Sequence, residues 1–116
     1  LVIGGLVVFR NMSEGGGTSR VTKYDEFAQC LTDKGARFFG AYWCPHCKDQ
    51  KALLDNSTKM PYIECSTPNG QGQLQQCIDE EIKGYPTWKF ADGTVVDQVL
   101  ELTALAEKTG CTLPQV

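Results

Sequence analysis

The strongest constraint on the fold is a pair of cysteines two residues apart, placed at the end of a short apolar stretch. The stretch is ARFFGAYW, residues 36–43, and Cys44-Pro45-His46-Cys47 follows it directly. A short run of apolar and aromatic residues predicts a buried strand. Proline suits the first position of a helix, where its missing N–H is not needed. The sequence therefore predicts a strand that leads into Cys44 and a helix that begins at Pro45.

A cysteine at the start of a helix is well placed for reactivity. The first helical turn presents unpaired backbone N–H groups and the positive end of the helix dipole, and both stabilise a thiolate. We expect Cys44, at the exposed helix start, to be the attacking thiol, and Cys47 to resolve the mixed disulfide that it forms. His46, the single histidine of the chain, is expected to approach the sulfur and donate a hydrogen bond.

Zinc binding is the main alternative use of this cysteine pair. Cys65 and Cys77 can supply two further ligands, but they do not form a second closely spaced pair. A helix that starts on the first pair also hinders the chain from wrapping around a metal, so we expect no bound metal. A purely structural Cys44–Cys47 disulfide is disfavoured because so small a loop constrains the unfolded chain little.

The rest of the chain alternates between helical and strand patterns. Helices are predicted at about 22–34, 45–54, 73–82 and 102–110, and strands at 36–43, 60–65, 86–90 and 94–99. Thr22 and Asp25 can form a capping box, and Asp92-Gly93 is a strong hairpin signal. Strands separated by helices predict parallel crossovers, and the hairpin adds an antiparallel edge. The order predicts an α/β fold, a four-stranded mixed sheet with helices on both faces.

Two further segments carry specific expectations. In the helix after Pro45, the packing residues are expected to be Ala52, Leu53 and Leu54. Pro86 stands at the start of a predicted strand, one of the few strand positions that tolerate proline. A cis bond there would direct the Tyr85 backbone at a neighbouring loop, and a trans proline that enters an edge strand is the alternative.

Composition indicates which cellular compartment and which partners suit the chain. Six cysteines among 116 residues favour an oxidising compartment, and the net charge of −3 argues against a nucleic-acid partner. Residues 1–10 hold an apolar run too short to span a bilayer, which needs about 20 residues. We interpret them as the end of a membrane segment or anchor, with a trimmed signal segment and a packed strand as the alternatives. Residues 11–20, with three consecutive glycines, are predicted to be a flexible linker, and 21–116 the folded domain.

The chain resembles the thioredoxin superfamily over about residues 22–112. The resemblance rests on YWCPHC at the strand–helix junction and on GYPT before the last hairpin. It implies that Cys44 is the nucleophile, that Cys47 is the resolving thiol, and that Pro86 is a cis-proline beside them. It also implies that the Tyr85 backbone pairs with a bound client strand.

A narrower resemblance can be stated. Cys-Pro-His-Cys is similar to the motif of DsbA-type oxidants, and Trp43 and Pro45 are expected to contact the client beside the thiols. Cys65 and Cys77, followed by GYPTW, look like the thioredoxin-like domain fused to vitamin K epoxide reductase homologues of bacteria and plant plastids. The resemblance implies cysteine-containing client proteins and a membrane domain or protein that reduces a quinone. It implies that this domain itself binds no cofactor. It also implies that the domain lies on the extracytosolic side of a membrane, in a periplasm or thylakoid lumen.

One residue departs from the family pattern, and two cysteine pairs leave alternatives open. Thioredoxins carry a buried acid six residues before the first cysteine, where this chain has Phe38. A proton relay from that strand, and a role as a cytosolic reductant, are therefore less favoured. For Cys65 and Cys77 we expect a structural disulfide, with a second redox pair as the alternative. Cys30 and Cys111 either pair or remain thiols; we expect unpaired thiols, because the first and last helices of this fold pack on opposite faces of the sheet.

The predicted activity is that of a protein thiol–disulfide oxidoreductase. It would oxidise dithiols of exported proteins and pass the electrons to a membrane quinone reductase. The alternatives are a non-catalytic binding or chaperone module and a reductant fed by a membrane electron donor. An intact cysteine pair favours an enzyme, while the direction of electron flow depends on the reduction potential of the partner.

Overall fold

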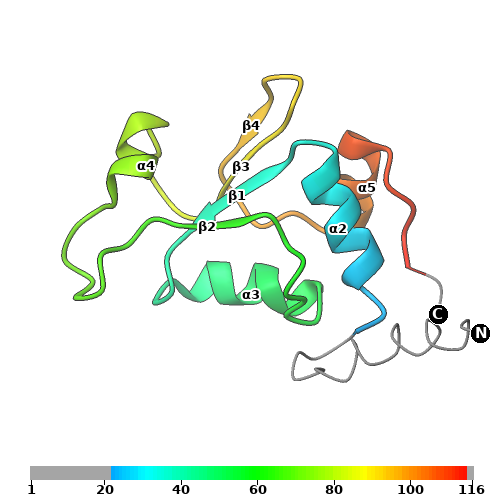
Figure 1. The fold of residues 1–116 in the computed structure, drawn as a ribbon, viewed down its shortest axis with the longest axis horizontal. Coiled ribbons are helices and arrows are strands. Elements are labelled where there is room, and N and C mark those ends of the chain that lie inside the picture. The colour runs from blue at the N-terminus through cyan, green and yellow to red at the C-terminus, as the bar shows by residue number, and fades with distance from the viewer. Residues whose placement is uncertain (1–21, 115–116) are drawn as a thin grey trace, which may run out of the picture.

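The computed structural model describes residues 22–114, so the predictions for residues 1–20 lie outside the described residues. The chain follows the predicted order of helices and strands (Figure 1). The helices are α2 (Asp25–Asp33), α3 (Pro45–Leu53), α4 (Gln75–Asp79) and α5 (Leu102–Thr109), and the strands are β1 (Arg37–Gly40), β2 (Tyr62–Glu64), β3 (Thr87–Lys89) and β4 (Val95–Val96). Over residues 22–114, no helix combines the length and the apolar character that crossing a membrane requires.

The four strands form one mixed sheet in the order β2-β1-β3-β4. β1 pairs with β2 in parallel, whereas the β1–β3 and β3–β4 pairs are antiparallel. The predicted fold class is confirmed, but the expectation of parallel crossovers is wrong for β3. The helix before β3, α4, has only five residues. At 1.5 Å per residue it is too short to carry the chain back along the sheet, so β3 starts at the end where β2 finishes.

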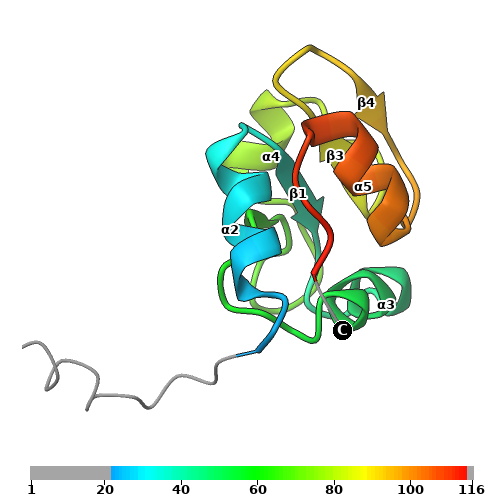
Figure 2. The ribbon, with the colours of Figure 1, turned by 90° about the vertical axis from the view of Figure 1, so that its right-hand side faces the viewer.

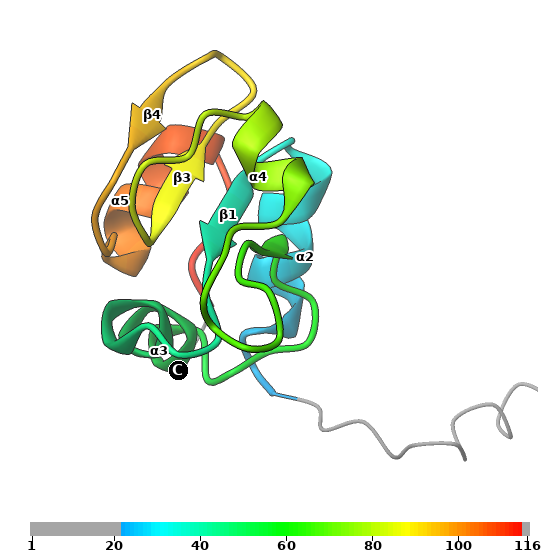
Figure 3. The same cartoon turned by 90° about the vertical axis from the view of Figure 1, so that its left-hand side faces the viewer.

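Neighbouring residues of β1 point to opposite faces of the sheet and build two hydrophobic clusters. Phe38 stacks on Trp88 with ring centroids 5.0 Å apart, in a cluster that includes buried residues of α2, α3 and α5. Phe39 packs on the other face with the cysteines that hold α4. Figure 1 shows α4 on one side of the sheet and α2 and α5 on the other, and Figure 3 shows α4 on the near side of β1. Helices therefore cover both faces, as predicted.

Cys30 and Cys111 form a disulfide with an S–S distance of 2.10 Å, so the expectation of unpaired thiols is wrong. That expectation placed the first and last helices on opposite faces. In the structure, α2 and α5 contribute Leu31 and Leu105 to the same hydrophobic cluster. Gly110, with φ of 82°, ends α5 in the left-handed region that favours glycine. The chain then turns back between α5 and α2 (Figure 2).

Local signals at the ends of two helices are partly confirmed. The hydroxyl of Thr22 accepts a hydrogen bond from the backbone N–H of Tyr24, and the Asp25 carboxylate accepts one from the N–H of Thr22. The Asp25 half of the expected pair therefore forms, but the N-cap of α2 is Tyr24, whose side chain makes no capping bond, so the prediction that Thr22 caps the helix is wrong. On α3 the packing prediction is correct for Leu54, which is buried, and wrong for Ala52, which is exposed.

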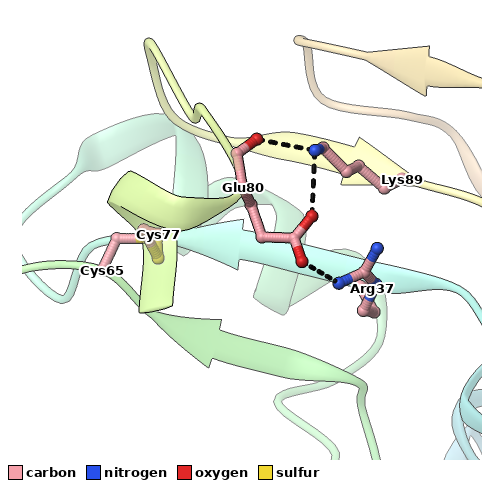
Figure 4. Close-up of polar contacts among 5 residues, drawn as sticks. All are labelled: Arg37, Cys65, Cys77, Glu80 and Lys89. Carbon is pink, nitrogen blue, oxygen red and sulfur yellow. Dashed lines mark hydrogen bonds and ion pairs between the residues drawn. A yellow bond between two sulfur atoms is a disulfide. The ribbon is translucent and has the colours of Figure 1, made fainter. Parts of the chain in front are cut away.

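Two sets of bonds attach α4 to the sheet (Figure 4). The predicted Cys65–Cys77 disulfide is present, with an S–S distance of 2.02 Å. At the end of α4, the Glu80 carboxylate lies 2.9 Å from Arg37 of β1 and 3.1 Å from the Lys89 ammonium of β3. Lys89 also donates to the backbone carbonyl of Glu80, at 2.7 Å. Hydrogen bonds from these two cations hold the pKa of Glu80 below its usual value.

Removing either disulfide should lower the free energy of unfolding, and the longer loop should matter more. The Cys30–Cys111 bond spans 81 residues and the Cys65–Cys77 bond spans 12. The chain-entropy model gives about 4.5 and about 3 kcal/mol respectively. We expect the Cys30→Ser/Cys111→Ser variant to lose more stability in denaturant unfolding than its Cys65→Ser/Cys77→Ser counterpart. A Cys65→Ser/Cys77→Ser variant with unchanged stability but lost oxidase turnover would identify that pair as a redox relay.

Candidate active site

The two closely spaced cysteines lie where the sequence places them, at the junction of β1 and α3. Cys44 is the N-cap of α3, and Pro45 stands in the first turn. The backbone N–H of Cys47 donates to the Cys44 sulfur at 3.3 Å, so this sulfur occupies the position of a capping side chain. Both cysteines are free thiols. A sulfur that accepts a hydrogen bond at a helix N-terminus is in a setting that stabilises a thiolate.

The two thiols differ in burial. Cys44 is 5% exposed and Cys47 is fully buried, so the expectation of an exposed helix start is wrong for the cysteine itself. Burial, with a smaller contribution from the hydrogen bond with Cys44, raises the pKa of Cys47 to about 12. The Cys47 sulfur is therefore shielded from any large partner in the folded protein, while part of Cys44 reaches the surface.

Gly40, the last residue of β1, allows this close packing. A Cβ atom at Gly40 would lie 2.9 Å from the Cys47 sulfur and 2.9 Å from Cε1 of Tyr62. Both distances are shorter than real Cβ contacts, so any larger side chain would have to displace the thiol or the ring. Gly40 was not recognised as a site residue from the sequence, although it lies four residues before Cys44.

The loop before β3 closes one side of the site. The Tyr85–Pro86 peptide bond is cis, which the resemblance implied. The Tyr85 carbonyl oxygen lies 3.8 Å from the Cys44 sulfur and accepts its S–H. His46, Tyr85 and Pro86 line a groove of about 370 Å³ together with residues 97–99. The structure thus brings Cys44, Cys47, Tyr85 and Pro86 together.

His46 lies beside this groove but does not approach either sulfur. Its side chain is 73% exposed, and its Nδ1 atom lies 3.8 Å from the Asp49 carboxylate. The hydrogen bond that we expected from the ring to the Cys44 sulfur is absent from the structure of residues 22–114. The expectation that His46 contacts the thiols is therefore wrong for this structure.

Two exposed aromatic rings brace the loop that leads into Cys44. The indole N–H of Trp43 donates to the Ser66 hydroxyl at 2.8 Å, and the ring packs edge-to-face with Tyr85 at 5.9 Å. The hydroxyl of Tyr42 donates to the Pro68 carbonyl at 2.6 Å. Trp43 therefore packs on Tyr85, whose carbonyl contacts Cys44, and its contact with a client stays a prediction. Tyr42 and Ser66 were not recognised from the sequence.

Glu64, at the end of β2, organises the same loop. One of its carboxylate oxygens accepts hydrogen bonds from the backbone N–H groups of Tyr42, at 3.1 Å, and of Ser66, at 3.0 Å. The other oxygen accepts from the Tyr62 hydroxyl at 2.8 Å. The sequence signal that could have revealed Glu64 is an acidic residue at the end of a buried strand, directly before a disulfide-forming cysteine.

Gln50 is a further residue that sequence reasoning missed. It is fully buried on α3, and its side-chain oxygen accepts from the indole N–H of Trp88 at 2.9 Å and from the backbone N–H of Leu100 at 2.7 Å. Its amide group donates to the Leu100 carbonyl at 2.9 Å. These bonds attach α3 to β3 and to the segment that enters α5, which fixes the orientation of the helix that carries Cys47.

The zinc alternative does not fit the arrangement of the cysteines. Cys65 and Cys77 are bonded to each other rather than directed at the Cys44–Cys47 pair. Among the residues that the structure describes, no three histidine, cysteine or acidic side chains come together in a way that could hold a metal ion.

Comparison with known proteins gives two informative matches, although no family model matches the chain. The thiol-disulfide oxidoreductase LTO1 of Arabidopsis thaliana is 38% identical over 94 residues, which cover 76% of this chain and 24% of that protein. The thioredoxin domain-containing protein 5 homolog of Drosophila melanogaster is 31% identical over 80 residues, 59% of this chain and 18% of that protein. The chain thus spans a quarter or less of the length of these two relatives. Together, the two similarities support a thioredoxin-like superfamily.

The Gly40→Ala substitution tests the close packing of Cys47. The added methyl group meets the Cys47 sulfur and the Tyr62 ring at 2.9 Å. Overpacking of this kind costs about 1–3 kcal/mol, so we expect lower stability in denaturant unfolding and a slower reaction of the thiol pair. Gly84→Ala is the matched control, because nothing lies within 4 Å of its Cβ position. Equal stability of the two variants would contradict the close contact.

Proposed function

We propose that this domain is a protein thiol–disulfide oxidoreductase in which Cys44 exchanges disulfides with client proteins and Cys47 completes the exchange. The observation that carries the proposal is the pair of free thiols at the start of α3, with the Cys44 sulfur as the helix cap and the Tyr85 carbonyl beside it. The similarity to LTO1, whose name describes the same activity, supports it.

The exchange consists of two sulfur displacements. In the oxidising direction, a client thiolate attacks the Cys44 sulfur of the Cys44–Cys47 disulfide, and Cys47 leaves as a thiolate that takes up a proton. A second client thiolate then attacks the client sulfur of the mixed disulfide and releases Cys44. The client loses two electrons and two protons, and the enzyme gains them as two thiols.

We propose further that the domain oxidises its clients and that its electrons pass to a membrane protein or domain that reduces a quinone. On this proposal the domain lies on the extracytosolic side of a membrane, in a periplasm or thylakoid lumen. Two disulfides elsewhere in the domain, Cys30–Cys111 and Cys65–Cys77, support an oxidising compartment. Phe38, buried where thioredoxins carry an acid, argues against a thioredoxin-type reductant.

Trapping of clients tests the roles of the two cysteines. In a Cys47→Ala variant, the Cys44 thiolate can still attack a client disulfide and displace one client thiolate, and the resulting mixed disulfide should persist because the thiol that expels the client in this direction is gone. We expect non-reducing gels and mass spectrometry to show client proteins attached at Cys44. The matched Cys44→Ala variant should trap few or none. Equal trapping by Cys44→Ala would reverse the assigned roles, and a folded pair of variants that trap nothing would favour a non-catalytic binding module.

The reduction potential of the Cys44–Cys47 pair tests the direction of electron flow. We expect a value nearer that of DsbA, about −120 mV, than that of thioredoxin, about −270 mV. Equilibration with glutathione, followed by quantification of both thiol states, measures it. A potential at or below that of thioredoxin would support the reductant alternative, in which the same residues run the exchange in reverse.

A further inference from the structure

A lysine is seated on an aromatic ring beside the buried thiol. Lys51 lies four residues after Cys47 on α3, a spacing that places both on one side of the helix. Its ammonium nitrogen is 3.9 Å from the centroid of the Tyr62 ring. Cation–ring contacts of this length are attractive, and more so where water is partly excluded. Lys51 is only partly exposed, so part of its side chain is covered by the protein, and its ammonium group lies on the ring.

The Tyr62 ring is itself held in place. Its hydroxyl donates to the Glu64 carboxylate at 2.8 Å, and the ring packs edge-on against Phe38 at 5.0 Å. The ring atom Cε1 and the Cys47 sulfur both lie 2.9 Å from the Cβ position of Gly40. The ring and the sulfur are therefore neighbours over one glycine, and the cation on the ring is brought close to the thiol.

The charges around Cys47 come from two elements. On its own helix are Cys44 and Lys51, and on β2 are Tyr62 and Glu64, whereas Gly40 of β1 brings no charge. Burial and Cys44 both raise the pKa of Cys47, whereas a backbone hydrogen bond at Ala41 and, to a smaller extent, the charge of Lys51 act in the opposite direction. Phe38 cannot supply or accept a proton where thioredoxins carry an acid. The cation of Lys51 thus opposes the cost of a buried thiolate.

We propose that Lys51 stabilises the Cys47 thiolate during disulfide exchange and that Tyr62 is the positioning residue that holds Lys51 there. The inference rests on the proposed function, in which Cys47 leaves as a thiolate when a client attacks Cys44. In the reverse reaction Cys47 loses its proton to solvent, attacks the Cys44 sulfur of a mixed disulfide and expels the client as a thiolate. Both the oxidising and the reducing reaction pass through the buried Cys47 thiolate, so Lys51 stabilises the same anion in each direction.

A colorimetric disulfide separates the contributions of the two thiols. When the reduced domain reacts with dithiobis(nitrobenzoate), Cys44 attacks first and releases one nitrothiobenzoate. Cys47 then attacks the Cys44 mixed disulfide and releases the second, leaving the Cys44–Cys47 disulfide. Stopped-flow absorbance records the two releases as successive phases. The first phase reports on Cys44 and the second on the Cys47 thiolate, so the second phase should accelerate about tenfold per pH unit below the pKa of Cys47.

Lys51→Met removes the charge and keeps most of the aliphatic chain. We expect the second phase to slow by about three- to tenfold at neutral pH, which corresponds to a rise in the pKa of Cys47 of half a unit to one unit. The first phase should remain within about twofold of the parent rate. Lys51→Arg should restore the second phase. Lys48→Met is the matched control, since Lys48 is an exposed lysine on the same helix, and it should change neither phase.

Substitutions at Tyr62 test whether its ring holds Lys51 in position. Tyr62→Phe keeps the ring under Lys51 and should leave most of the Lys51→Met effect intact. Tyr62→Leu removes the ring and should slow the second phase, with little further slowing when Lys51→Met is added. Thermal melts accompany each variant, and Lys51→Gln replaces Lys51→Met if the latter does not fold.

The outcomes separate the inference from the proposed function. If the parent domain shows two phases and Lys51→Met changes neither, the inference is overturned and the proposed function stands. If both phases slow together in Lys51→Met, the lysine has a structural role and the inference is also overturned. If the folded parent domain releases no second thiolate, the proposed function fails and the inference fails with it.

Discussion

The packing of the Cys47 side chain against Gly40 is the contact on which the rest of the site depends. Because the glycine has no Cβ, α3 approaches the sheet closely enough for the sulfur to be fully buried. The same approach sets the start of the helix beside the cis-proline loop, where Cys44 meets the Tyr85 carbonyl. Gln50, one turn further along the helix, fixes its orientation through three buried hydrogen bonds. A helix held at both points presents one thiol and hides the other.

Hiding a thiol has an electrostatic consequence that shapes the chemistry. A neutral Cys47 is stable in the interior, but its thiolate loses hydration there, which raises its pKa to about 12. Disulfide exchange must pass through this anion in either direction. The first thiol has the N-terminus of α3 to stabilise its charge. The second lies deeper, where a backbone hydrogen bond at Ala41 and the cation of Lys51 on the Tyr62 ring favour its thiolate. The two cysteines of one short motif therefore use different parts of the fold.

Much of this arrangement could be predicted from local sequence, and the remainder depends on contacts between distant segments. The strand–helix junction at Cys44 follows from an apolar run and a proline, both of which act on neighbouring residues only. Cys30 and Cys111 were wrongly predicted to be unpaired thiols, because their pairing depends on which face of the sheet α5 covers after the hairpin. A buried glutamine such as Gln50 has no local signature, since its partners lie 38 and 50 residues away. Likewise, nothing near Lys51 in the sequence indicates the ring on which it lies.

The Cys65–Cys77 disulfide is linked to the active-site loop through the two residues that flank Cys65. Cys65 lies between two residues that contact the loop before the reactive thiols. Glu64, on one side of it, accepts from the backbone of Tyr42, and Ser66, on the other, accepts from the Trp43 indole. A bond that restrains Cys65 therefore restrains both contacts, and through them the loop that ends at the helix cap. Structural support and functional influence are thus two effects of one covalent link, so slower exchange that accompanies lower stability in a variant without it does not indicate a relay.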